Sequence, residues 1–134
     1  MRDHVLVRAL FAVAALYDGL LGLAFLAAPA ALFAFYGVAP PNHFGYVRFP
    51  AAILIVFALM FLAVARDPAG NRNLIPYGVL LKFAYCGVVS YYWFSVGLPD
   101  MWKPFAVDDL VFLVLFAWAY AALRRPAYPG IRLP

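Results

Sequence analysis

The sequence contains no glutamate, no glutamine and no threonine, and all six of its acidic residues are aspartate. Only 12% of its 134 residues are charged and 68% are hydrophobic, whereas a typical soluble domain is about 25% charged and about 45–50% apolar. These few polar side chains could not cover the surface of a soluble fold of this length. The composition therefore excludes a soluble enzyme, a soluble nucleic-acid-binding domain and a disordered tail, and it predicts an integral membrane protein.

Cysteine, histidine and serine are also scarce, which removes several kinds of catalytic and metal chemistry. The single cysteine, Cys86, cannot form an intrachain disulfide or supply a set of thiolates for zinc or an iron–sulfur cluster. With two histidines and two serines, the chain offers no nucleophile–base pair held by a third group and no paired-histidine haem motif. We therefore expect no catalytic residues of a common type, and the residues point to no particular cofactor.

The sequence is dominated by long apolar runs. Four of them approach the ~20 residues that a transmembrane helix needs. We expect these helices at about 5–28, 47–65, 74–96 and 104–123. Pro50, Pro76 and Pro104 each fall near a predicted first turn, where a missing N–H breaks no helical hydrogen bond. The expected fold is an all-α bundle of four transmembrane helices, with residues 1–134 forming one membrane domain.

The connector 29–46, between the first two spans, is the longest. Residues 30–36 are apolar and aromatic, and they are followed by Gly37 and then by the pair Pro40-Pro41, which end a helix. We expect a short helix here that lies in the membrane interface. Residues 124–134 are expected to form a short irregular tail.

Positive charge predicts the orientation of the bundle. Seven of the ten basic residues lie in the N-terminal segment, the second connection and the C-terminal segment, which four spans place on one side of the membrane. They are Arg2, Arg8, Arg66, Arg72, Arg124, Arg125 and Arg132. The positive-inside rule therefore places both termini in the cytoplasm. The first span is longer than the apolar part of a signal peptide and carries Asp18, so we expect it to stay uncleaved. Because the basic residues sit at the ends of apolar runs, the net charge of +4 indicates no nucleic-acid partner.

Two ionisable residues lie well inside predicted spans, where each costs about 2.5–3.5 kcal/mol on insertion scales. Asp18 lies in the first span and Lys82 in the third. One interpretation is a buried ion pair that joins these two helices. The other is a proton-titrating or ligand-binding site, to which Tyr17 and Tyr85 would contribute. On the third span Lys82, Tyr85 and Cys86 share one helical face, so an aromatic, quinone-like or sterol-like ligand could bind beside them.

A second polar cluster is expected near the opposite, outer surface. Asp108 and Asp109 project about 100° apart on the fourth span, so one of them should face the bundle. Arg48, at the same depth on the second span, is the expected partner, and His43 could join it. A metal site made from these aspartates, His43 and Asp100 has only proximity in its favour, so no metal is expected.

The first span also carries Ala15, Gly19 and Gly22 at spacings of four and three residues. Small side chains placed in this way let another helix approach closely. The approaching helix could belong to this chain or to a second copy.

The first span begins with Arg8 before Ala-Leu-Phe, and continues at residues 17–22 with Tyr-Asp-Gly-Leu-Leu-Gly. A proline-ended helix and an amphipathic connector follow. In this layout the chain resembles small bacterial four-helix membrane proteins of the DoxX-like type, along nearly its whole length in architecture and at a few positions in sequence. The resemblance implies a location in the bacterial inner membrane. It also implies an accessory role, because some members are named as small subunits of quinone-linked membrane oxidoreductases.

These observations favour a non-enzymatic membrane protein. It would be an accessory subunit of a larger membrane complex, or it would bind a lipid or quinone-like ligand between the first, third and fourth spans. Its partners would be membrane lipids and either other membrane subunits or a second copy. An alternative is a small proton-coupled transporter that titrates Asp18, although pairing with Lys82 argues against it. A weaker alternative is a lipid-modifying enzyme with Asp18, Lys82 and Tyr85 as acid–base groups.

Overall fold

The computed structural model describes residues 2–124, in which helices and turns occur and no strand does. The long helices are α1 (Arg2–Ala27), α3 (Gly45–Arg66), α4 (Ile75–Phe94) and α5 (Lys103–Ala122). The short ones are α2 (Pro29–Phe35), η1 (Arg72–Leu74) and η2 (Asp100–Trp102). Four segments are long and apolar enough to cross a membrane, which confirms the predicted all-α class. The expected tail falls, apart from Arg124, outside the described residues.

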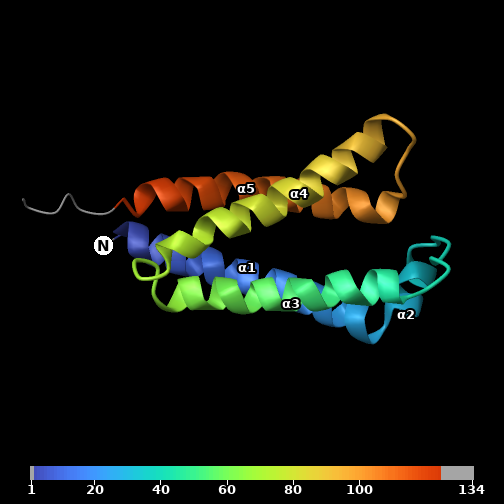
Figure 1. Cartoon of the computed structure of the whole chain (residues 1–134), viewed down its shortest axis with the longest axis horizontal. Coiled ribbons are helices and arrows are strands. Elements are labelled where there is room, and N and C mark those ends of the chain that lie inside the picture. The colour runs from blue at the N-terminus through green and yellow to red at the C-terminus, as the bar shows by residue number, and fades with distance from the viewer. Residues whose placement is uncertain (1, 125–134) are drawn as a thin grey trace, which may run out of the picture.

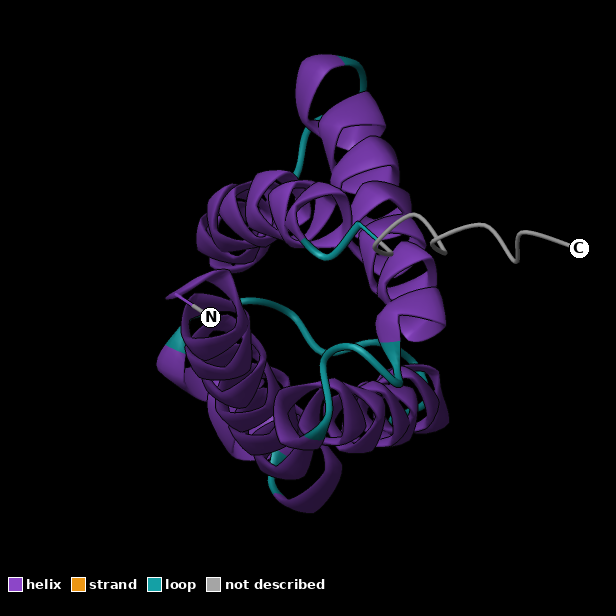
Figure 2. Ribbon diagram, turned by 90° about the vertical axis from the view of Figure 1, so that its left-hand side faces the viewer, coloured by secondary structure: helices purple, strands orange, loops and turns teal. Residues whose placement is uncertain are grey.

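The long helices associate as two antiparallel pairs, α1 with α3 and α4 with α5 (Figure 1). Viewed along the bundle, they surround a common centre (Figure 2). The start of α1, the turn between α3 and α4 and the end of α5 lie together at one end of the molecule, which we call the termini end. The segments α2 and η2 lie at the opposite end, which we call the α2 end.

An aromatic core joins the two pairs at the termini end. Phe11 of α1, Phe61 of α3 and Phe116 of α5 are fully buried. The Phe11 and Phe116 rings stack with centroids 4.6 Å apart, and the Phe61 ring lies 5.1 Å from that of Phe116. These large rings pack together in the space between α1, α3 and α5 at this end of the bundle.

The α2 end is built around a second, smaller aromatic cluster. Phe25 of α1 stacks on Trp102 of η2 with centroids 5.7 Å apart, and Phe33 of α2 meets the same indole edge-on at 5.9 Å. The α2 helix ends as the sequence predicts, because Gly37 follows it with φ +65°, a conformation that favours glycine. Trp102 thereby ties the connector 29–46 to the start of α5.

One proline lies elsewhere than predicted. Because α3 begins at Gly45, Pro50 falls inside the helix and not in its first turn. Proline has no N–H, so the carbonyl of Tyr46, four residues earlier, has no helical donor. Pro76 and Pro104 occupy the first turns of α4 and α5, as expected.

The small residues of α1 serve a contact within this chain. A Cβ at Gly19 would lie 3.5 Å from the Cβ of Ala58 on α3, which is ordinary contact. A Cβ at Gly22 would lie only 2.7 Å from the carbonyl oxygen of Ala51. The absence of a side chain at Gly22 therefore sets how closely α1 approaches α3.

We predict that Gly22→Ala destabilises the protein, because the new methyl group meets backbone that cannot move without separating α1 from α3. The expected loss is about 1–3 kcal/mol in the free energy of unfolding. Gly87→Ala in α4 is the matched control, since a Cβ there meets nothing within 4 Å. It should leave the stability unchanged or raise it by up to about 1 kcal/mol. Thermal unfolding in detergent followed by circular dichroism measures both, and equal effects would contradict the close approach.

Candidate functional site

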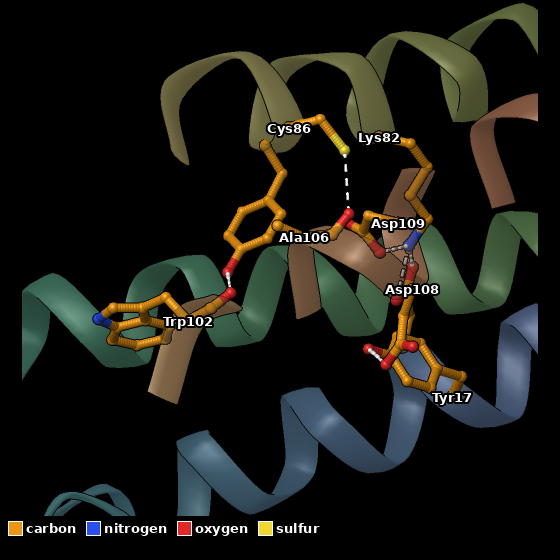
Figure 3. Close-up of polar contacts among 9 residues, drawn as sticks. Tyr17, Lys82, Cys86, Trp102, Ala106, Asp108 and Asp109 are labelled. Atoms are coloured by element: carbon orange, nitrogen blue, oxygen red, sulfur yellow. Dashed lines mark hydrogen bonds and ion pairs between the residues drawn. The ribbon is translucent and has the colours of Figure 1, made fainter. Parts of the chain in front are cut away.

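A buried ionic group lies at the centre of the bundle. The Nζ of Lys82 on α4 lies 2.9 Å from both carboxylate oxygens of Asp18 on α1 and 2.8 Å from Oδ1 of Asp109 on α5. Asp18 and Lys82 are 1% exposed and Asp109 is 8% exposed. Figure 3 shows Lys82 reaching from α4 down to Asp109. The predicted pair of Asp18 and Lys82 is present, and Asp109 is a third member that sequence reasoning assigned elsewhere.

The charges of this group do not balance. One ammonium faces two carboxylates, so the three ionised side chains carry one net negative charge. An ammonium has three N–H donors, and three carboxylate oxygens lie within bonding distance of Nζ. Lys82 therefore has no donor left for another molecule.

The two adjacent aspartates of α5 diverge as the helical spacing predicts. Asp109 turns inward to Lys82, whereas Asp108 is exposed and accepts a hydrogen bond from the Tyr17 hydroxyl at 3.0 Å. Tyr17 therefore joins α1 to α5 beside the ionic group and does not contact Lys82 through its hydroxyl.

The expected contacts of the outer cluster of His43, Arg48, Asp108 and Asp109 are wrong. Arg48 Nε donates to the Leu26 carbonyl at 3.2 Å, and His43 Nδ1 accepts from the Gly45 N–H at 2.9 Å. Both residues satisfy backbone groups at helix ends, which have no partner within their own helix. Arg48 thus binds the end of α1 and His43 the start of α3, and neither is bonded to the aspartates.

Tyr85 and Cys86 link α4 to the start of α5. The Tyr85 hydroxyl donates to the Trp102 carbonyl at 3.1 Å, and the Cys86 Sγ lies 3.5 Å from the Ala106 carbonyl (Figure 3). These bonds hold α4 beside α5 at the level of the ionic group. The Tyr85 hydroxyl proton is thus taken up by a backbone carbonyl.

A cavity of about 470 Å³ lies beside the ionic group. Among the described residues that line it, the charged ones are Asp18 and Asp109, which form what we call its acidic floor. The walls are Leu21, Phe25, Tyr46, Val47, Phe49, Pro50, Ala51, Ile53, Leu54, Leu81, Tyr85, Trp102 and Phe105. The space is therefore apolar along its length and acidic at one end.

The helix α3 supplies the largest share of these walls, which sequence reasoning missed. It placed a ligand between the first, third and fourth spans, whereas Tyr46, Pro50 and Leu54 of the second span line one helical face toward the cavity. Tyr46 and Phe49 are 71% and 70% exposed, so the cavity opens beside α3 toward the surroundings. The spacing of these residues was visible in the sequence, but α3 is apolar on every face, so no contrast marked it.

No group of three or more histidine, cysteine, aspartate or glutamate side chains within residues 2–124 is placed to hold a metal ion. Asp18 and Asp109 share Lys82. The acidic floor is thus organised around an ammonium.

We predict that Lys82→Met costs much more stability than Asp109→Asn. The first change leaves two buried carboxylates without a cation and should cost about 3–5 kcal/mol. The second leaves a neutral pair of Asp18 and Lys82 and keeps an acceptor oxygen at position 109, so it should cost about 1 kcal/mol. Denaturant unfolding in detergent compares the variants. If Asp109→Asn lowers the free energy of unfolding as much as Lys82→Met does, the negative charge of Asp109 is needed for stability and the group does not carry an excess charge.

No protein-family model, curated protein or solved structure matches the chain. The resemblance to DoxX-like proteins accordingly remains a prediction from the sequence. The cavity combines an acidic floor, apolar walls and a mouth beside α3.

Proposed function

We propose that the chain is a non-enzymatic membrane protein that binds a lipid or quinone-like amphiphile in this cavity. The observation that carries the proposal is the shape and lining of the site. Its volume of about 470 Å³ falls within the ~300–1,000 Å³ of small-molecule sites, which pair apolar walls with a few polar groups. A ligand with an apolar body and a small polar head would lie along α3 with its head at the acidic floor.

The position of the mouth supports entry from the bilayer. Tyr46 and Phe49 line the cavity and are also largely exposed at the side of the bundle where the cavity opens. In a membrane this side meets lipid. An amphiphile can therefore enter sideways from the bilayer without moving its apolar body through water.

The contacts of the polar side chains favour binding over catalysis or proton-coupled transport. Lys82 uses all of its donors on carboxylates, and Tyr85 donates to a backbone carbonyl. Both oxygens of Asp18 accept from Lys82, which leaves this carboxylate poorly placed to exchange protons with a transported cation. The acid–base groups considered for an enzyme or a transporter are thus occupied in holding the helices together.

We further propose that the protein lies in a bacterial inner membrane with both termini in the cytoplasm, and that it acts as an accessory subunit beside other membrane subunits or a second copy. The arginine-bearing segments support this orientation. Arg8, Arg66 and Arg72 lie toward the same end of the bundle, the termini end (Figure 1). The positive-inside rule assigns such an end to the cytoplasm.

The orientation predicts which turns react with a membrane-impermeant maleimide. In a Cys86→Ser background, Asn42→Cys at the α2 end should be labelled in intact spheroplasts. Ala69→Cys, in the exposed turn of the termini end, should be labelled only after lysis. The reverse pattern would place the termini outside the cytoplasm.

We predict that Ile53→Trp blocks the cavity, because Ile53 lines it and an indole fills the space that the ligand needs. Protein extracted in mild detergent is examined by native mass spectrometry. The wild type should carry an additional small-molecule mass, and the occupancy should fall at least about tenfold in the variant, a change of ~1.4 kcal/mol.

Val56→Trp is the matched control, since Val56 lies on the same helix, is 58% exposed and does not line the cavity. It should retain the wild-type mass. Equal occupancy in Ile53→Trp and the wild type, or a wild type that carries no small molecule, would contradict binding in the cavity. Arrival with larger subunits at fixed stoichiometry would support the accessory role.

A further inference from the structure

We infer that the ligand is a cationic amphiphile whose protonated amine lies against Asp109. This inference rests on the proposed function, and it specifies the chemical class of the head group. Its basis is the arrangement of charges, donors and acceptors at the acidic floor of the cavity.

The negative charge at the acidic floor favours a positively charged head group. Asp18 and Asp109 line the cavity, whereas Lys82 lies behind them and does not. A molecule in the cavity therefore meets two carboxylates before it meets the ammonium, in a group with one net negative charge. Asp108, on the adjoining face, has the neutral Tyr17 hydroxyl as its partner and adds no positive charge. A cation at the floor balances the group, and an uncompensated buried charge is otherwise costly.

The acidic floor also offers a hydrogen-bond acceptor that a protonated amine can use. Asp109 bonds Lys82 through Oδ1, while Oδ2 has no hydrogen-bond partner among residues 2–124. Every fully buried side-chain oxygen in that range has a partner, so Oδ2 is an accessible acceptor, and its residue lines the cavity.

The hydrogen-bond donors near the acidic floor already have partners within the protein. The three N–H groups of Lys82 point to carboxylates, and the Tyr85 hydroxyl donates to the Trp102 carbonyl. The indole of Trp102 lies away from Asp109 (Figure 3). A quinone carbonyl at the floor would thus find no donor, and a carboxylate or phosphate head would face two like charges.

The walls of the cavity are rich in aromatic side chains. Phe25, Tyr85, Trp102 and Phe105 all line the cavity. Aromatic faces attract cations as well as apolar chains. The same walls therefore suit the alkyl body of an amphiphile and do not oppose a positive charge on it.

The experiment compares four probes that share a long alkyl chain: dodecylammonium, dodecanol, dodecanoate and a decyl-substituted benzoquinone. Binding is measured by calorimetric titration of the whole protein in phosphatidylcholine nanodiscs at neutral pH. Ile53→Trp nanodiscs, in which the cavity is filled, give the partitioning of each probe into lipid. Dodecylammonium should bind the wild type at least about tenfold more tightly than the other probes, as expected for a charge-assisted hydrogen bond.

Two adjacent aspartates provide a matched pair of variants. Asp109→Asn should remove most of the preference for dodecylammonium over dodecanol while the protein remains folded by circular dichroism. Asp108→Asn should leave that preference intact, because Asp108 does not line the cavity. Equal losses in the two variants would assign the preference to the general surface potential and overturn the inference.

The probes also separate failure of the inference from failure of the proposed function. If all four probes bind the wild type better than Ile53→Trp with similar affinities, or the quinone binds best, the cavity binds amphiphiles and the assigned head group is wrong. If no probe binds the wild type better than Ile53→Trp, both the inference and the proposed function fall.

Discussion

The ammonium of Lys82 holds three helices in register by bonding two carboxylates in the interior of the bundle. It extends from α4 and meets Asp18 of α1 and Asp109 of α5 at 2.8–2.9 Å. Such bonds are strong in a medium of low dielectric constant, and they weaken sharply when a partner is displaced. The relative positions of the two helix pairs, and with them the position of the acidic floor, therefore depend on this one side chain.

The aromatic residues then divide the bundle into a closed part and an open part. On the termini side of Lys82, Phe11, Phe61 and Phe116 fill the interior. On the α2 side, α4 runs obliquely away from α1 and α3 (Figure 1), and Trp102 packs against Phe25 without filling the space next to α3. The divergence of the helices on the α2 side leaves the cavity. The ionic group forms its floor, and it opens beside α3.

The proposed binding role rests on the second carboxylate of the ionic group. A single aspartate is enough to pair with Lys82, and Asp18 already accepts bonds from it through both oxygens. Asp109 adds a second carboxylate whose Oδ2 remains accessible beside the cavity. A structural pair would be complete without Asp109, which is why we assign the binding role to this residue.

The sequence by itself determined the all-α class and the four apolar spans, because so few polar residues leave long apolar helices as the physical solution. It offered the pairing of Asp18 with Lys82 as one of two interpretations, because each of these intramembrane charges needs a partner. Only the tertiary structure decided that Asp109 turns inward, that Arg48 and His43 serve helix ends, and that α3 forms the cavity wall. The physical reason is that a membrane helix is apolar on all faces, so its sequence carries little contrast between the side that meets lipid and the side that meets protein. Which faces meet depends on close packing between helices, such as that of Gly22 against Ala51.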